Sequence, residues 1–559
     1  MSLESSLKIS RVFQYMPHGS SKLLSPEREL LRTERKILTP PNRAKLNPNP
    51  YPHAFIHKFC DKDALLSVRA ELHALQTTYK ETDLFKVYQT GDLANIDTDN
   101  PAHQKAMKNT IQLRAALYSA AFRKFVQKLT GCEHLIDKTD MSCNVYKQGG
   151  HLLCHDDVIG TRCVSYIIYL SRPEKKWQPS DGGALELYEL DSEGVPRDAP
   201  SLCLPPEFGA LVLFAVVPGQ SFHSVAEVLS STDRLSISGW FHARQPPPEA
   251  ETMASLAQLK RSFPPQPFKR IKVSSAAVNV FENLKGLANL VNSSYLEPLT
   301  IQAIRRQLKT EGAVQLASFL RPDAFKKILR AAAAADLSAG FGSGRPSGPP
   351  TYSVGIEGSW VLVGPPHLQR YCRYETPRNQ NGDAAQAGRL LWKLRSAFLS
   401  EIFTTFIRLI SGRKLRASRA EVRRFRPGHD YTLAHAGQLN KQTLLDMTFC
   451  CVPLTRNGAA EALQMWDSGD VGGFECLLER DESSGAAEVY NVDSDQGGVT
   501  SIHAANNTLN LTLRQPDTMK FVKYVSAAAP CSRWDVAVEY KLGQARKGAN
   551  KSERRPIKS

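Results

Sequence analysis

Tyr146-Lys-Gln-Gly-Gly-His-Leu-Leu-Cys-His-Asp-Asp157 is the stretch of this 559-residue chain from which fold and chemistry can first be predicted. It ends with His155 and Asp157, directly after a run of mixed polarity that is typical of a β-strand. Residues two positions apart in an extended segment lie on the same face, so this imidazole and this carboxylate can bind one metal ion together. Asp156 also offers a carboxylate but lacks this spacing. The stretch therefore predicts a strand that ends at a metal site.

A second histidine and an arginine follow in an order that completes such a site. His223 lies 66 residues after Asp157 (223 − 157), and Arg234 lies 11 residues after His223 (234 − 223). Two imidazoles and one carboxylate leave three coordination positions open, which is the ligand set of non-haem Fe(II). The guanidinium of Arg234 can bind a dicarboxylate in a bidentate fork. His223 alone is more typical of a packing residue, and His242 is a rival ligand that falls after Arg234.

The segments between the two histidines predict a mainly β fold. Asp181-Gly-Gly-Ala-Leu-Glu-Leu-Tyr188 and Ala210-Leu-Val-Leu-Phe-Ala-Val-Val217 are short runs rich in apolar residues, bounded by Gly, Pro and Asp. Short strands broken by such turns are typical of a small β-barrel or of a double-sheet jelly roll.

These motifs resemble those of the 2-oxoglutarate- and Fe(II)-dependent dioxygenases, in particular the prolyl hydroxylases. The resemblance is closer still to the fungal and animal nuclear–cytoplasmic prolyl hydroxylases that modify a small-subunit ribosomal protein at the decoding centre. It covers most of the chain and is strong up to about Phe241. The segments that carry it are Pro50–Phe59, Asp83–Leu93, Asn144–Gly150 and the turn at Asp181.

The resemblance implies roles for six residues and a set of cofactors. His155, Asp157 and His223 would bind Fe(II), and Arg234 would bind the distal carboxylate of 2-oxoglutarate. Tyr169 and Tyr146 would assist Arg234, with O2 as second co-substrate and ascorbate as a further cofactor. Without the resemblance, the sequence does not distinguish a role of Tyr169 and Tyr146 in co-substrate binding from simple packing.

The position of Tyr169 relative to Tyr166 is informative. The two are three residues apart in an apolar run, so in a strand they point to opposite faces. One of them can therefore face the interior of the barrel.

The family further implies prolyl 3-hydroxylation, or 3,4-dihydroxylation, of the ribosomal protein, with an effect on translation accuracy and termination. A second function from another class is a scaffold, alone or beside catalysis. Its partners would act in translation termination, mRNA-tail metabolism or oxygen-dependent degradation of a transcription factor. A third is a nucleobase demethylase, which needs a basic groove with aromatic residues for the flipped base.

Charge counts against a nucleic-acid face. The net charge is +16, of which residues 1–47 carry +5 (9 − 4) and residues 541–559 carry +6 (7 − 1), leaving +5 for the middle. Basic tails of this kind serve solubility, nuclear import or attraction to ribosomal RNA. The middle does not form a broad basic surface for phosphates, which disfavours the demethylase.

The spacing of the cysteines and the hydropathy of the chain indicate its cellular compartment. Eleven cysteines without a Cys-x-x-Cys pair fit neither a disulfide framework nor a zinc ribbon. We find no signal peptide and no apolar run of the ~20 residues that span a bilayer. The chain is therefore expected in the nucleus and cytoplasm, without a membrane partner.

The chain also contains an internal repeat. Leu113–Gly131 and Leu394–Gly412 align without a gap, and both predict an amphipathic helix closed by a glycine. Three further pairs occur in the same order: Phe59–Leu65 with Phe319–Phe325, Tyr146–Gly149 with Phe425–Gly428, and Asp181–Tyr188 with Gly472–Glu479. The predicted fold class is α+β, mainly β, with two tandem double-stranded β-helix (jelly-roll) domains and flanking helices.

The second copy is predicted to be catalytically degenerate. With one inserted residue His155 aligns with His435, but Gly437 then replaces Asp157. Ser501-Ile-His503-Ala can be aligned with the segment around His223, and Arg514 fits the spacing of Arg234 while Lys520 fits only with a gap. Two imidazoles alone are a poor Fe(II) site. The copy would serve either as a docking surface for a protein substrate or as a packing partner for the first copy.

The predicted domains divide the chain into five parts: a basic extension (1–47), the catalytic domain (48–244), a Pro-rich linker (245–275), the non-catalytic domain (276–540) and a basic tail (541–559).

Overall fold

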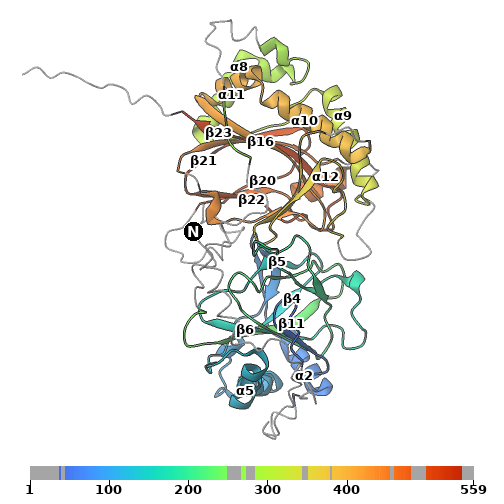
Figure 1. Ribbon diagram of the computed structural model, residues 1–559, viewed down its shortest axis with the longest axis vertical. Coiled ribbons are helices and arrows are strands. Elements are labelled where there is room, and N and C mark those ends of the chain that lie inside the picture. Colours follow the sequence, from blue (N-terminus) through green and yellow to red (C-terminus); the bar gives the residue numbers. More distant parts are fainter. Residues whose placement is uncertain are drawn as a thin grey trace, which may run out of the picture.

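The computed structural model describes residues 37–38, 45–247, 266–271, 284–342, 351–377, 381–439, 441–453, 459–479 and 499–543. Most of the predicted extension, linker and tail lies outside these residues. Figure 1 shows two β-rich bodies, which we name the N-terminal unit (residues 45–247) and the C-terminal unit (residues 266–271 and the described parts of 284–543). No helix of the described chain is long and apolar enough to cross a membrane.

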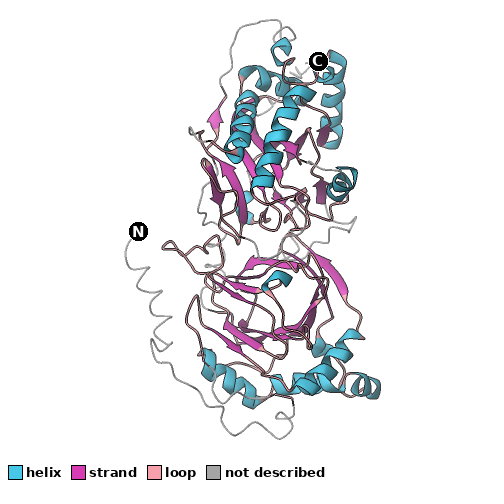
Figure 2. Ribbon diagram, turned by 90° about the vertical axis from the view of Figure 1, so that its right-hand side faces the viewer, coloured by secondary structure: helices cyan, strands magenta, loops and turns pink. Residues whose placement is uncertain are grey.

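The N-terminal unit is built on one eleven-stranded antiparallel sheet with strand order β1-β9-β6-β11-β4-β3-β5-β10-β7-β8 and β2 beside β3. Its strands curl around a common interior, with the helices on one outer side (Figure 2). The strands are β1 (His53–Ile56), β2 (Thr78–Glu81), β3 (Phe85–Gln89), β4 (Met141–Tyr146), β5 (His151–His155), β6 (Arg162–Tyr169), β7 (Leu185–Leu187), β8 (Leu202–Leu204), β9 (Leu211–Ala215), β10 (His223–Val225) and β11 (Arg234–His242). The helices are α2 (Lys62–His73), α3 (Pro101–Ala106), α4 (Lys108–Leu117) and α5 (Ala120–Thr130), with short 3-10 turns η3 (Leu93–Asn95) and η4 (Pro179–Asp181).

Alternation along β6 separates two apolar clusters. Tyr166 and Ile168 belong to the cluster shared with helices α2, α4 and α5, whereas Ile167 and Tyr169 belong to the cluster of the interior. Successive side chains of a strand point to opposite faces, so β6 is covered on both sides and reads as a continuous apolar run. The prediction that Tyr166 and Tyr169 face opposite ways is confirmed.

A β-bulge in β5 sets the direction of the ligand residues. His223 pairs with His155 and Val225 pairs with Leu152, so β5 carries one extra residue opposite β10. A bulge lets two consecutive side chains lie on the same side of the strand. Leu152 packs inside the N-terminal unit, whereas Leu153 packs on the C-terminal unit and Cys154 on Tyr188 and Phe222. Cys154 thus points away from the ligands.

The C-terminal unit has a nine-stranded sheet with order β13-β21-β18-β23-β16-β15-β14, with β12 on β16 and β17 on β15, and a three-stranded sheet with order β20-β19-β22. Its strands are β12 (Lys269–Arg270), β13 (Ala313–Leu316), β14 (Trp360–Val363), β15 (Gln369–Tyr374), β16 (Leu415–Phe425), β17 (Tyr431–Thr432), β18 (Leu444–Cys451), β19 (Glu475–Glu479), β20 (Val499–Ile502), β21 (Thr508–Arg514), β22 (Thr518–Val522) and β23 (Arg533–Leu542). Its helices are α8 (Pro298–Glu311), α9 (Pro322–Ser338), α10 (Asp383–Phe398), α11 (Glu401–Ser411) and α12 (Ala459–Asp467), with 3-10 turns η5 (Lys285–Leu287), η6 (Ser293–Leu296) and η7 (Ala436–Gln438).

The two repeated helical segments are each split into two helices, which corrects the prediction of one helix per segment. Ser119 caps α5 by accepting a hydrogen bond from the amide of Phe122 at 3.1 Å, and Ser400 caps α11 through Phe403 at 3.3 Å. Serine favours an N-cap over a helix interior because its hydroxyl satisfies a free backbone N–H. The glycines that follow α5 and α11 adopt left-handed backbone, as predicted.

The two units are joined by buried polar contacts. Glu227 of the N-terminal unit accepts hydrogen bonds from Tyr524 Oη (3.1 Å), Ser526 Oγ (2.6 Å) and the amide of Ala527 (2.7 Å). Asp83 accepts one from the amide of Ala434 at 2.8 Å. The strands β5, β7 and β10 therefore face the interior of their own unit on one side and the C-terminal unit on the other.

Candidate metal and co-substrate site

His155, Asp157 and His223 form the one group of three or more possible ligands that the described residues place for a metal ion. One ligand atom from each lies within 4.8 Å of the others. His155 Nε2 is 3.2 Å from Asp157 Oδ1, and His223 Nε2 is 3.4 Å from Asp157 Oδ2. The sequence prediction that these residues meet is correct.

Backbone carbonyls orient both imidazoles. His155 Nδ1 contacts the carbonyl of Leu153 and His223 Nδ1 contacts the carbonyl of Ser221, each at 2.8 Å. A proton on each Nδ1 leaves Nε2 as a lone pair directed at the centre of the group, as in protein metal sites. Trp240 Nε1 donates to Asp157 Oδ2 at 3.0 Å and fixes the carboxylate.

The backbone of Asp157 differs from the prediction. We expected His155 and Asp157 on one face of an extended segment, but β5 ends at His155 and Asp157 has φ of 62°. Left-handed backbone is uncommon for residues other than glycine and is tolerated best by Asn and Asp. A turn, not strand alternation, therefore brings the carboxylate back to the imidazole.

The charges of the group support one another. Burial opposes ionisation of Asp157, yet His223 and His155 hold the pKa of its carboxyl well below the usual range. Burial lowers the pKa of His155, but the Asp157 carboxylate outweighs it and raises the pKa above the ordinary value. The Asp157 carboxyl is therefore ionised at neutral pH, and a divalent cation that binds here would compete with a proton for His155.

The rival ligands lie elsewhere. Asp156 accepts hydrogen bonds from the amides of Val158 (3.3 Å) and Gly219 (3.1 Å), which brace the loop. His242 contacts Thr161 Oγ1 at 3.0 Å and Asp140 Oδ2 at 3.3 Å. Neither belongs to the metal-binding group.

Arg234 lies on the neighbouring part of the interior with hydrogen-bonding capacity left over. It is 1% exposed, and its Nε donates to the carbonyl of Gly183 at 2.7 Å. Its Nη2 and the Tyr169 hydroxyl have no hydrogen-bond partner among the described residues. The Arg234 guanidinium carbon lies 5.0 Å from the Tyr146 ring centre and 5.3 Å from that of Tyr169.

These groups fit the cofactors that the sequence predicts. A buried cation without an acidic partner is costly, and an incoming carboxylate removes that cost. Two free Nε2 atoms and one carboxylate fit Fe(II), and Arg234 with Tyr169 fits the far carboxylate of 2-oxoglutarate. Burial raises the pKa of Tyr169, although Arg234 opposes the shift, so its hydroxyl stays a donor.

Sequence reasoning missed Tyr51 and the role of Trp240. Tyr51 is 4% exposed, and its hydroxyl has no partner among the described residues. Its ring centre lies 6.1 Å from Phe214, which lies 4.6 Å from His223. Burial and the nearby Cys154 and Asp157 raise the pKa of Tyr51 well above the ordinary value. Tyr51 lies 104 residues before His155 (155 − 51), so the spacing of the ligand motif gave no signal for it.

Strand pairing corrects two alignments of the C-terminal unit. In the N-terminal unit, His223 pairs with Leu187, which lies four residues after Gly183. In the C-terminal unit, Lys520 of β22 pairs with Leu477, which lies four residues after Gly473. Lys520 therefore stands where His223 would be, and His503, beyond β20 on the other edge of β19, does not.

The arginine is displaced in the same way. Arg533 pairs with Phe425 and donates to the carbonyl of Gly473, as Arg234 pairs with Tyr146 and donates to that of Gly183. Arg514 instead forms an ion pair with Asp446 at 2.9 Å.

The corresponding interior of the C-terminal unit neutralises its own charges. Glu475 contacts Arg533 Nη2 at 3.0 Å, Lys520 Nζ at 3.2 Å and Arg423 Nη2 at 3.3 Å. Burial disfavours the carboxylate, but these three cations lower the pKa of Glu475 to about 2. Among the described residues of this interior, the three cations that contact Glu475 are thus neutralised and not free for a dicarboxylate.

Two family profiles match the chain. Residues 141–242 match the 2OG-Fe(II) oxygenase superfamily. Residues 282–548 match the family described as oxoglutarate and iron-dependent oxygenase degradation C-term. The first match includes His155, Asp157, His223 and Arg234.

Two curated relatives cover most of the chain. A protein named prolyl 3,4-dihydroxylase OGFOD1, from Ostreococcus tauri, is 38% identical over 508 residues, which are 89% of this chain and 96% of the relative. A protein named prolyl 3-hydroxylase OGFOD1, from Xenopus laevis, is 28% identical over 494 residues, 85% of this chain and 83% of the relative.

Among solved structures, a Pseudomonas putida prolyl-4-hydroxylase is 24% identical and covers 34% of this chain and 92% of its own, with a TM-score of 0.24. The assignment rests on the sequence relatives and the profiles, which make the chain a 2-oxoglutarate-dependent dioxygenase of mainly β, jelly-roll type. The chain belongs to the family of 2-oxoglutarate- and Fe(II)-dependent prolyl hydroxylases that includes these two relatives.

Proposed function

We propose that this protein hydroxylates a prolyl residue of a small-subunit ribosomal protein at ring carbon 3, or at carbons 3 and 4. His155, Asp157 and His223 would bind Fe(II), Arg234, Tyr169 and Tyr146 would bind 2-oxoglutarate, and ascorbate would sustain turnover. The observation that carries the proposal is the metal-binding group beside a buried arginine without an acidic partner. The names of the two relatives support prolyl hydroxylation.

The residues divide the work between binding and exclusion of water. Fe(II) and 2-oxoglutarate supply the oxidative chemistry when bound. Trp240 and the carbonyls of Leu153 and Ser221 hold the ligand atoms in place, so binding the metal requires little rearrangement. Tyr51, Tyr169 and Phe214 belong to the apolar cluster of the interior and keep water from the reacting groups.

We also infer that the C-terminal unit is a second, catalytically degenerate copy of the jelly roll. The neighbour order β13-β21-β18-β23-β16-β15 repeats β1-β9-β6-β11-β4-β3 and supports this inference. So do the turns Gly182–Gly183 and Gly472–Gly473, all with positive φ. Gly437 and Lys520 replace two of the three ligands, which supports the loss of the metal. The predicted domain bounds need adjustment at two places, because β12 (Lys269–Arg270) of the predicted linker pairs with β16 and because β23 extends to Leu542 of the predicted tail.

The second candidate function is a scaffold. The interior charges of the C-terminal unit neutralise one another, so we infer that this unit binds partner proteins and does not catalyse a reaction. Translation-termination and mRNA-tail factors are the partners that we propose for it. The proposed locations are the nucleus and the cytoplasm, without a strong nucleic-acid face.

The deciding experiment is intact-mass spectrometry of small-subunit ribosomal proteins incubated with the protein, Fe(II), ascorbate and 2-oxoglutarate. A gain of one or two oxygens on a single protein, absent with Asp157→Ala, would establish activity and substrate together. Succinate release without a mass gain would keep the enzyme and discard the ribosomal substrate. Neither signal would favour the scaffold.

A further inference from the structure

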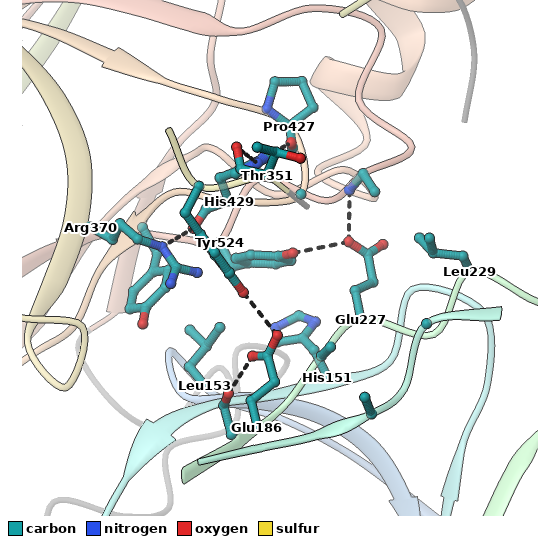
Figure 3. Close-up of a pocket in the computed structure, with 18 of the residues that line it drawn as sticks. His151, Leu153, Glu186, Glu227, Leu229, Thr351, Arg370, Pro427, His429 and Tyr524 are labelled. Carbon is teal, nitrogen blue, oxygen red and sulfur yellow. Dashed lines mark hydrogen bonds between the residues drawn. The ribbon is translucent and has the colours of Figure 1, made fainter. Parts of the chain in front are cut away.

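A cavity of ≈ 580 Å³ lies between the two units, outside the metal site. The N-terminal unit lines it with His151 of β5, Glu186 of β7 and Glu227, which lies two residues after β10. The C-terminal unit contributes Arg370 and Tyr524 among others (Figure 3). Cavities of this size bind small organic molecules in other proteins.

Arg370 is the unusual group of this cavity. Seven arginines are buried in the described chain, and five of them form ion pairs: Arg373, Arg424, Arg426, Arg514 and Arg533. The two without an ion pair to a described residue are Arg234 and Arg370. Arg234 lies where it can bind a carboxylate of the co-substrate. Arg370 is likewise buried without an ion pair to a described residue, and it lies in the cavity between the units.

Arg370 forms no ion pair with a described residue, although the Asp198 and Asp430 carboxyl groups lie close enough to interact with it electrostatically. Its Nε donates to the carbonyl of His429 at 2.7 Å, and its Nη1 to the carbonyl of Asp198 at 3.3 Å. Its guanidinium carbon lies 4.2 Å from the Tyr352 ring centre and 5.3 Å from that of Tyr431. Carbonyls and aromatic faces stabilise a cation without neutralising it. The nearby Asp430 is already bound to Arg426.

A hydrogen-bond acceptor without a donor lies on another wall. His151 is 3% exposed, and its Nδ1 contacts the carbonyl of Gly149 at 3.0 Å, which places the ring proton there. Its Nε2 has no partner among the described residues. Burial and Lys523 lower the pKa of His151 to about 3, so the ring is neutral and Nε2 accepts.

The acidic residues of the cavity restrict where an anion can lie. Glu186 accepts from Tyr352 Oη at 3.0 Å and Ser224 Oγ at 2.6 Å, and Glu227 is bonded to the C-terminal unit as described. Figure 3 shows Arg370 and Glu227 at opposite sides of the pocket. A ligand carboxylate is therefore favoured at Arg370 alone, and a hydrogen-bond donor is favoured toward His151 and Glu227.

We propose that the cavity between the units binds a small carboxylic acid that carries an amino or hydroxyl donor, with its carboxylate on Arg370 and its donor toward His151. Apolar side chains such as Leu153, Leu229 and Phe341 line the remaining surface and suit an apolar ligand body. The ligand bridges the two units and stabilises their association.

The test is a calorimetric titration of the full chain, loaded with Fe(II) and 2-oxoglutarate under anaerobic conditions so that the catalytic site is filled. The probes are L-phenylalanine, L-3-phenyllactate and 3-phenylpropionate, which share a ring and a carboxylate and differ in the donor. The amino or the hydroxy acid is expected to bind at least about fivefold more tightly than the acid without a donor. Which of the two binds identifies the ligand class.

Variants locate the binding. Arg370→Gln is expected to weaken the best probe at least about tenfold, whereas Arg197→Gln, a change at a surface arginine, leaves it unchanged. His151→Phe preserves a ring beside Tyr524 and is expected to remove the preference for a donor, which keeps the test decisive if Arg370→Gln does not fold. Undiminished binding or preference in these variants overturns the proposal. So does the absence of binding by wild type up to about 10 mM of either donor-bearing probe.

Discussion

Arg234 is held by the carbonyl of Gly183, by Ser236 Oγ, which accepts from its Nη1 at 3.3 Å, and by two aromatic rings. Its Nη2 has no hydrogen-bond partner among the described residues. Its planar fork can form two parallel hydrogen bonds with a carboxylate, a geometry that an ammonium group cannot reproduce. The first prediction follows from this difference.

Arg234→Lys is expected to raise the concentration of 2-oxoglutarate needed for half-maximal turnover by about tenfold or more, because a point charge replaces the fork. Succinate release at varied 2-oxoglutarate measures the effect, with the surface change Arg197→Lys as control. An unchanged requirement would show that Arg234 does not bind the co-substrate.

For single residues, the sequence predicted which side chains belong to the candidate site better than it predicted their backbone conformations. The spacing and order predicted that His155, Asp157 and His223 meet, and the structure brings them together, with His155 and His223 at strand ends and Asp157 in the turn after β5. The left-handed turn at Asp157 was not predictable, since a two-residue spacing fits both an extended segment and a turn. Tyr51 is brought in only by the pairing of β1 with β9.

At the level of strands, the two units differ in the residues that stand at the positions of His223 and Arg234. The proposed repeat, with Gly437 in place of the carboxylate, is a prediction from the sequence, and strand pairing favours Lys520 and Arg533 over His503 and Arg514 as the counterparts of His223 and Arg234. His503 and Arg514 are 11 residues apart (514 − 503), like His223 and Arg234, whereas Lys520 and Arg533 are 13 apart (533 − 520). The spacing agreed by coincidence, and only strand pairing identifies the equivalent positions.

Restoring the carboxylate alone is therefore expected to fail. In an Asp157→Ala background, Gly437→Asp should not create a metal site, because the Lys520 ammonium occupies the place of the second imidazole and is paired with Glu475. Iron bound per chain after desalting measures this, with the wild-type chain as control at about one. Stoichiometric iron in the double variant would contradict the equivalence of Lys520 and His223.

The whole molecule depends on polar contacts between residues hundreds of positions apart, which no local pattern predicts. Glu227 is central: burial raises the pKa of its carboxyl, although the three donors of the C-terminal unit oppose the shift. A carboxylate without a cationic partner is stable there only while those donors remain in place.

Glu227→Ala is expected to lower the free energy of unfolding by about 2–4 kcal/mol, because it leaves three buried donors without an acceptor. Hydrogen exchange at the amides of residues 524–527 should accelerate in parallel. Glu227→Gln, which retains one acceptor oxygen, should fall between this variant and wild type. Exchange at wild-type rates in both variants would show that Glu227 does not hold the units together.

Two neutral histidines at the junction predict acid sensitivity. Burial lowers the pKa of His151 and of His429 to about 3, below the ordinary value of 6.5. Between these values the unfolded chain binds the protons and the folded chain does not, so stability falls as the pH drops below about 6.5.

Each histidine should contribute about 1.4 kcal/mol per pH unit to this slope near pH 5. His151→Phe is expected to reduce the slope by one such step, as followed by denaturant titrations at several pH values. His103→Gln on the exposed helix α3 should preserve it. An unaltered slope in His151→Phe would mean that this ring is protonated in the folded protein.

The bulge in β5 has a consequence for how this protein evolves. One strand presents His155 to the metal and Leu153 to Tyr431 and Tyr524 of the other unit, and these inward and outward directions are linked by a single extra residue. Natural selection for catalysis at the metal site therefore also constrains the surface of the C-terminal unit that packs on Leu153. Among descendants of this chain, replacements at Leu153 should be accompanied by compensating replacements at Tyr431 or Tyr524.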